Sequence, residues 1–344
     1  MRSCEAQAFV VSAAAAALLL WQICRRRGRS LIITDEQWKQ FEEEGFIVLP
    51  PAQVFDNPAA DVMALQQRIN EIMLGAAGVP YEKMMMQLDS TTGAYGSAGE
   101  QTLGFKGATL RYRKIQNLDL DPLVMSYLRR PVFREACRRI YGPLPISSFR
   151  TMFFNKPRSH ESGQAGGTHL PWHQCASRAR SSVLSPRAYL LAPQCRRLAS
   201  RLRRDRWRYL DRDPLLNVYL ALDPATKESG CVRFLPRSHK LGVVNPHHHS
   251  AFLTEEQAER LCGPRARLPV CELVLRPGEV ALIHNWVIHS SGVNSTAQPR
   301  RALSVSFMDA RTRLDHREFG GFLGGEHKSS GYPEGGMHFP LIFS

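Results

Sequence analysis

Hydrophobic and polar positions follow two different periods along this chain. Residues 61–74 place apolar side chains at helical spacing, and part of 122–140 does the same. Thr34 is followed by acidic and amide residues, which is the composition of a helix N-terminus, and a strand-like apolar run follows at 46–50. The N-terminal part of the chain is therefore predicted to be mainly helical.

After Phe149 the pattern changes to short apolar runs that are separated by Pro, Gly and Asp. These runs lie at 152–154, 215–222, 231–235, 268–275, 280–284 and 302–308. Helices followed by many short strands are typical of a helical layer packed on a barrel or double sheet. The predicted fold class is α+β and mainly β: a double-stranded β-helix of the jelly-roll or cupin-like type, with a supporting helical layer.

The first thirty residues differ from the rest. Residues 8–24 are almost entirely apolar, and four arginines follow between 25 and 29. This length is the lower limit for a membrane span, and the arginines favour a cytosolic position for everything that follows. We expect residues 1–30 to be a single transmembrane helix that anchors a cytosol-facing domain at a membrane. The alternative is a targeting segment for an organelle.

Residues 175–204 form a second unusual segment, with eight arginines and no Asp, Glu or Lys. They account for 8 of the formal net charge of +14, so the remaining chain carries only +6. The basic character thus belongs to one segment, and nucleic-acid binding is not predicted. A long loop of this kind is unusual inside a compact domain. We interpret 175–204 as a non-native insertion into a domain that spans 31–344. The alternative is that 175–204 is a genuine regulatory loop.

Three residues could form a metal site. His173 lies just before the insertion, and joining Gln174 directly to Asp205 would create a His-x-Asp motif. Residues i and i+2 of a strand share a face, so both side chains could point into a barrel. His289 would add a second imidazole. Two histidines and one carboxylate hold Fe(II) on one side and leave positions open for a cosubstrate and dioxygen.

Strand alternation also separates two adjacent arginines. The residues that share a face with Arg300 are small or weakly polar, whereas those that share a face with Arg301 are apolar: Ala302, Ser304, Ser306 and Met308 against Leu303, Val305 and Phe307. Arg300 is the better candidate for binding the distal carboxylate of 2-oxoglutarate with its guanidinium fork. The same test on 216–222 predicts that Asn217 and Tyr219 line the pocket.

The chain resembles the phytanoyl-CoA dioxygenase family from about residue 33 to 308, once 175–204 is set aside. The matching motifs lie at 34–48, 172–174, 226–240 and 289–300. This resemblance implies a catalytic domain over 31–344, with iron at His173, Asp205 and His289. It further implies 2-oxoglutarate at Arg300, with Ser290 and Gln174 beside it.

The predicted function is therefore that of an Fe(II)/2-oxoglutarate-dependent dioxygenase. It would hydroxylate a small organic or lipid-like substrate with dioxygen and release succinate and CO2, with ascorbate as a reductant. The alternative is a catalytically inactive family member with a binding or scaffold role, because the insertion splits the His-x-Asp motif.

Overall fold

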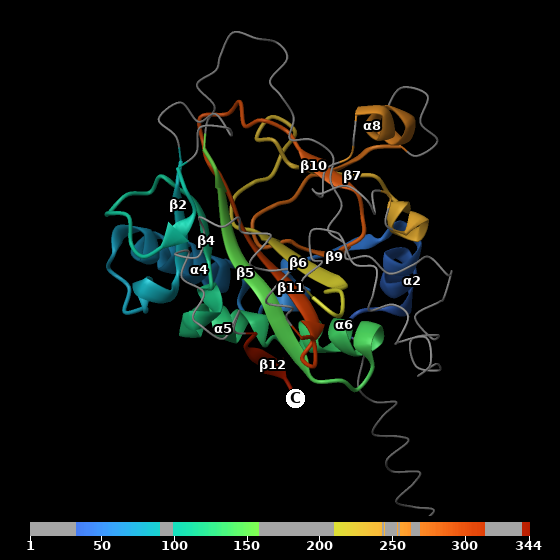
Figure 1. The fold of residues 1–344 in the computed structure, drawn as a ribbon, viewed down its shortest axis with the longest axis horizontal. Helices are drawn as coiled ribbons and strands as arrows, with labels where there is room; N and C mark the ends of the chain where they lie inside the picture. The colour runs from blue at the N-terminus through green and yellow to red at the C-terminus, as the bar shows by residue number, and fades with distance from the viewer. Residues whose placement is uncertain are drawn as a thin grey trace, which may run out of the picture.

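The computed structural model describes residues 32–89, 99–157, 210–242, 244, 253, 255–262, 269–313 and 339–344. Its centre is a nine-stranded antiparallel sheet in which the strands follow the order β1-β9-β6-β11-β5-β4-β2-β3, and β12 pairs with β5 (Figure 1). In chain order these strands are β1 (Phe46–Leu49), β2 (Met85–Leu88), β3 (Thr102–Leu103), β4 (Tyr112–Gln116), β5 (Ile146–Lys156), β6 (Leu216–Ala221), β9 (Val280–His284), β11 (Arg300–Asp309) and β12 (Leu341–Phe343).

A smaller antiparallel sheet of three strands accompanies the main sheet. Its order is β10-β7-β8, with bounds β7 (Val232–Phe234), β8 (Cys271–Leu273) and β10 (His289–Ser291). An apolar cluster joins the two sheets: Tyr219 and Ala302 of the main sheet share it with Phe234 and Leu273 of the small one. We call the face of the main sheet that meets this cluster its inner face.

Helices cover the opposite face of the main sheet. They are α2 (Asp35–Glu44), α3 (Pro51–Val54), α4 (Pro58–Leu74), α5 (Pro122–Leu128) and α6 (Pro131–Tyr141), while α8 (Glu255–Cys262) lies apart from them (Figure 1). Buried residues of α4, α5 and α6 share the largest apolar cluster with Leu303, Val305 and Phe307 of β11. We call this the helix face. The prediction of a helical layer on a mainly β domain is thus confirmed.

Local sequence explains where the first helix begins and ends. The Thr34 side chain accepts a hydrogen bond from the Gln37 backbone amide, and the Gln37 side chain accepts one from the Thr34 backbone amide, which closes a capping box. The helix ends at Gly45, whose φ of 85° favours glycine. A Cβ atom there would overlap Val287 and His239, so the turn also needs glycine for space.

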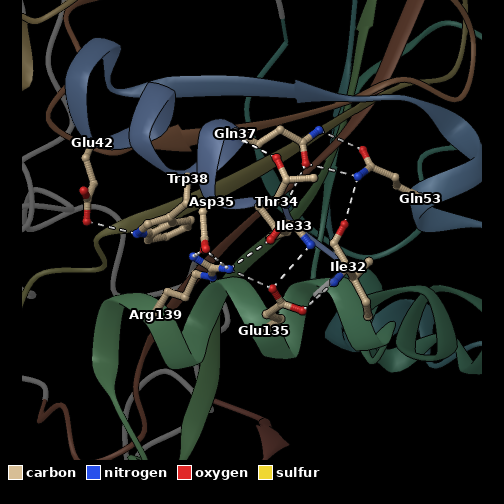
Figure 2. A network of polar contacts seen from close by, with 10 residues as sticks. All are labelled: Ile32, Ile33, Thr34, Asp35, Gln37, Trp38, Glu42, Gln53, Glu135 and Arg139. Carbon is tan, nitrogen blue, oxygen red and sulfur yellow. Dashed lines mark hydrogen bonds and ion pairs between the residues drawn. The ribbon is translucent and has the colours of Figure 1, made fainter. Parts of the chain in front are cut away.

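The start of the described chain is fastened to α6 (Figure 2). The backbone amides of Ile32 and Ile33 donate to Glu135 at 3.0 and 3.3 Å, and Arg139 donates to the Ile33 carbonyl at 2.9 Å. Ile33 itself is fully buried. Ile32 and Ile33 are therefore part of the packed domain.

The predicted transmembrane helix is contradicted. Over the residues that the structure describes, no helix has the length and apolar character needed to cross a bilayer. The helices here are amphipathic: α4, with 17 residues, buries only one side on the sheet, whereas a span needs about 20 largely apolar residues. The stretch 1–30 and the predicted insertion at 175–204 both lie outside the described residues.

Candidate cosubstrate and metal site

Arg300 and Arg301 begin β11 and point to opposite faces of the main sheet. Arg300 lies on the inner face, is 6% exposed, and donates from Nη1 to the Tyr219 hydroxyl at 2.6 Å. Its buried Nε has no hydrogen-bond partner among the residues that the structure describes. A buried guanidinium N–H without a partner is costly, so this group suits a ligand that would accept from it.

Arg301 is instead fully engaged by the protein. Its Nε and Nη2 donate to the Asp223 carboxylate at 2.7 and 2.8 Å, and its Nη1 donates to Asn70 of α4 at 2.9 Å. These hydrogen bonds raise the pKa of Arg301, and burial opposes them. Arg301 therefore ties β11 to the helix face and leaves cosubstrate chemistry to Arg300.

Tyr219 and Asn217 both lie on the inner face, as their alternation predicted, but they have different partners. Tyr219 is opposite Ser304 in the strand pairing, and burial raises the pKa of its hydroxyl while Arg300 opposes the shift. Asn217 accepts from Ser304 at 3.1 Å and donates to Ser306 at 3.0 Å. Tyr219 thus contacts the candidate clamp, and Asn217 organises the hydroxyl groups beyond it.

His289 is the first residue of β10 and the one predicted iron ligand that the structure describes. Its Nδ1 lies 2.9 Å from the Val287 carbonyl, which can only accept, so Nδ1 carries the proton. A histidine whose Nδ1–H is held by a backbone carbonyl presents Nε2 as the ligand nitrogen. The local geometry of His289 therefore fits a metal ligand.

The other predicted ligands, His173 and Asp205, lie outside the described residues, as does Gln174. Within the ranges that are described, no three His, Cys, Asp or Glu side chains are grouped so that they could hold a metal ion. The iron triad of His173, Asp205 and His289 accordingly stays a prediction.

Ser290 is almost fully buried and lies in the middle of β10 in the small sheet. It is opposite Arg233 in the pairing of β10 with β7, and the Arg233 Nε and Nη2 donate to its hydroxyl at 3.2 and 3.1 Å. The structure thus gives Ser290 an arginine partner that the sequence did not indicate. Its position beside the cosubstrate remains a prediction.

Lys156 is a residue of this site that the sequence analysis missed. It ends β5 directly opposite Arg300, and its Nζ donates to the Ser291 hydroxyl at 2.9 Å and to the Gly292 carbonyl. Burial lowers the pKa of Lys156 to about 6, and the charge of Arg300 acts in the same direction. The alternation of Met152, Phe154 and Lys156 was the available signal, but the pairing of β5 with β11 is needed to interpret it.

The chain is similar to known proteins over most of its length. A family model described as phytanoyl-CoA dioxygenase matches residues 41–302. The chain is 21% identical over 280 residues to a probable phytanoyl-CoA dioxygenase of Caenorhabditis elegans, covering 80% of this chain and 75% of that one. It is 22% identical over 281 residues to the human peroxisomal phytanoyl-CoA dioxygenase, covering 81% and 69%.

Solved structures agree on the fold. EctD from S. alaskensis, crystallised with 2-oxoglutarate and 5-hydroxyectoine, has a TM-score of 0.54 at 16% identity and covers 83% of this chain and 79% of its own. The non-haem α-ketoglutarate-dependent carbocyclase SnoK has a TM-score of 0.52 at 18% identity and covers 91% and 99%. The jelly-roll prediction is confirmed, and the expectation of Fe(II) and 2-oxoglutarate is supported.

Proposed function

Because this chain belongs to the phytanoyl-CoA dioxygenase family, whose members are Fe(II)/2-oxoglutarate-dependent oxygenases, we propose that it is an active hydroxylase. It would insert one oxygen atom of dioxygen into a C–H bond of a small organic or lipid-like substrate. The other oxygen atom would enter succinate as 2-oxoglutarate loses CO2. One observation carries this proposal: the buried Arg300 on the inner face has an Nε without a partner in the described chain.

Each residue of the site has a role that its contacts support. Arg300 would bind the distal carboxylate of 2-oxoglutarate through two N–H groups, as guanidinium forks do. The Tyr219 hydroxyl, 2.6 Å from Arg300 Nη1, would fix the orientation of that fork. His289 would supply an imidazole nitrogen to iron together with His173 and Asp205. Bound Fe(II) would supply the activation of dioxygen.

The side chains next to Arg300 on the inner face are small enough to leave space for a cosubstrate. Next to Arg300 on this face stand Ala302, Ser304 and Ser306, and all three are small. The two serine hydroxyls already form hydrogen bonds with Asn217. They therefore make a polar wall whose hydrogen bonds are formed within the protein. Such a wall leaves the guanidinium of Arg300 as the strongest donor toward a carboxylate.

Anaerobic titration of the purified chain with Fe(II) and 2-oxoglutarate tests the proposal. We expect the weak visible absorption band that 2-oxoglutarate gives when it chelates Fe(II), and we expect His289→Ala to abolish it. Arg300→Ala should weaken 2-oxoglutarate binding by about 2–5 kcal/mol, because one partner of a buried charge pair is removed. Arg301→Ala, assayed where it is folded, is the matched control and should bind 2-oxoglutarate normally.

Two outcomes would contradict the proposal in different ways. An unchanged 2-oxoglutarate affinity in Arg300→Ala would remove the assigned clamp. Tight binding of iron and 2-oxoglutarate, without succinate formation on any candidate substrate, would favour the inactive alternative. A variant that lacks 175–204 and gains succinate formation would assign that inactivity to the split His-x-Asp motif.

A further inference from the structure

Lys156 and Arg300 bring two basic side chains to one place on the inner face. They are direct cross-strand partners at the junction of β5 and β11, so both side chains leave the sheet on the same side. The described contacts of the Lys156 amine are neutral oxygens: Ser291 Oγ at 2.9 Å, the Gly230 carbonyl at 3.5 Å and the Gly292 carbonyl. A second buried basic group beside Arg300 therefore has no anionic partner among the described residues.

The same amine joins segments that are far apart in the sequence. Ser291 ends β10, the strand that begins with His289, Gly292 follows it directly, and Gly230 lies just before β7. The carbonyl of Lys156 accepts from Asn294 at 2.9 Å, which adds a second tie to the same stretch. The backbones of Gly230 and Gly292 approach so closely that a Cβ atom on Gly230 would overlap the Gly292 carbonyl. Lys156 therefore fixes the stretch that connects His289 to Arg300.

We propose that Lys156 is a positioning residue of the cosubstrate site. It holds the end of the His289 strand against β5, and when 2-oxoglutarate binds it adds a second positive charge beside Arg300. This inference rests on the proposed function, since the dicarboxylate is 2-oxoglutarate.

The electrostatics of Lys156 make the proposal measurable. The pKa of Lys156 is lowered to about 6, chiefly by burial and in smaller part by the charges of Arg300, Arg113 and Arg233, while Cys231 opposes the shift. At pH 7.5 the amine of the free protein is therefore mostly neutral. A dianion beside it favours the charged form, so 2-oxoglutarate binding takes up a proton. Affinity should consequently fall as pH rises above about 6.

Calorimetric titration of the full chain with 2-oxoglutarate tests this coupling. It is run anaerobically with Fe(II) in two buffers of different ionisation enthalpy. At pH 7.5 we expect uptake of about one proton per 2-oxoglutarate, and a Kd that rises up to about tenfold from pH 6.5 to 7.5. Lys156→Met should lose the proton uptake and the pH dependence, and its Kd should rise by about 10–100-fold.

Two further variants separate charge from structure. Lys156→Arg keeps a permanent charge, so it should bind 2-oxoglutarate without proton uptake and more tightly than Lys156→Met. Lys240→Met removes an exposed lysine that pairs with Glu43 outside the site, and it should behave as the wild type.

The outcomes are distinguishable. A wild-type chain that does not bind 2-oxoglutarate overturns the proposed function and this inference together. A wild-type chain that binds 2-oxoglutarate without proton uptake, at a pH-independent Kd, overturns the role of Lys156 alone. This outcome is measured on the wild type, so it does not depend on whether a variant folds. If Lys156→Met binds 2-oxoglutarate as tightly as the wild type, the role of Lys156 is likewise overturned.

Discussion

Arg300 and Arg301 are neighbours in the chain, but they serve two regions with opposite requirements. On the helix face, Arg301 meets the Asp223 carboxylate and the Asn70 amide, and its donors are engaged by the protein itself. On the inner face, Arg300 has the neutral Tyr219 hydroxyl as its partner and Lys156 as its cross-strand neighbour. On the helix face the arginine is neutralised by a carboxylate of the protein, whereas on the inner face it carries a positive charge that a ligand can neutralise.

The same contrast extends along β11. Leu303, Val305 and Phe307 enter the apolar cluster with the helices, while Ser304 and Ser306 exchange hydrogen bonds with Asn217 on the inner face. A strand with a period of two can therefore contribute to stability with one set of residues and to chemistry with the other. Substitutions at adjacent positions should separate the two contributions.

The largest expected effect comes from the helix face. Phe307 is fully buried and packs against Phe133 and Phe343, with ring centroids 6.2 and 6.0 Å away. Phe307→Ala should lower the free energy of unfolding by about 3–5 kcal/mol. Ser306→Ala, the adjacent inner-face change, removes one hydrogen bond to Asn217 and should cost only about 1 kcal/mol. Urea denaturation measures both, and equal losses would refute the division between the faces.

A smaller effect should distinguish the two arginines in the absence of ligand. Arg301→Ala leaves the Asp223 carboxylate without its main partner. A fully buried pair broken in this way costs about 3–5 kcal/mol, and partial solvent access reduces the expected loss to about 2–3 kcal/mol. Arg300→Ala should change ligand-free stability by less than about 1 kcal/mol, because the hydrogen bond it removes is to the neutral Tyr219 hydroxyl and not to a carboxylate. Thermal and urea unfolding of both variants would test this, and a larger loss in Arg300→Ala would reverse the assignment.

The smallest of these effects depends on pH. His284 ends β9 on the helix face, where burial and the neighbouring His239 lower its pKa to about 3. The unfolded chain binds this proton near pH 6.5, so stability is lost as pH falls from 6.5 toward 3. The loss between pH 6.5 and 5 should be about 2 kcal/mol.

Replacing His284 by Gln should remove this part of the acid sensitivity. Urea denaturation at pH 7 and pH 5 measures the difference between the variant and the wild type. An identical pH dependence in both proteins would mean that His284 is not held neutral on the helix face.

Much of the fold could be read from local patterns. The apolar spacing at 61–74 predicted α4, and the six short apolar runs predicted β5, β6, β7, β8, β9 and β11. The helical pattern at 122–140 is divided into α5 and α6, because Pro131 disfavours a helical conformation at Arg130. Strands β2 and β4 were not predicted, since their edge of the sheet is specified by pairing partners and not by a long alternation.

The site was predictable to the extent that it depends on one strand. Alternation along β11 and β6 separated Arg300 from Arg301 and brought Tyr219 to the inner face. Lys156 and Arg233 were missed, because their proximity to Arg300 and Ser290 arises from pairings between segments more than fifty residues apart. His173 and Asp205 stay predictions, since they lie outside the described residues.

The place of β11 in the sheet has a consequence for synthesis of the protein. This strand lies between β5 and β6, but it follows both in the chain and ends only at Asp309. During synthesis on the ribosome, one edge of the eleven-residue β5 therefore stays unpaired while about 150 further residues are added. Adding these residues takes on the order of ten seconds. The two halves of the main sheet can join only once β11 has been made, and Arg300 arrives with the strand that joins them. Nascent chains that stop before residue 300 would expose apolar strand edges, which are the surfaces that chaperones bind.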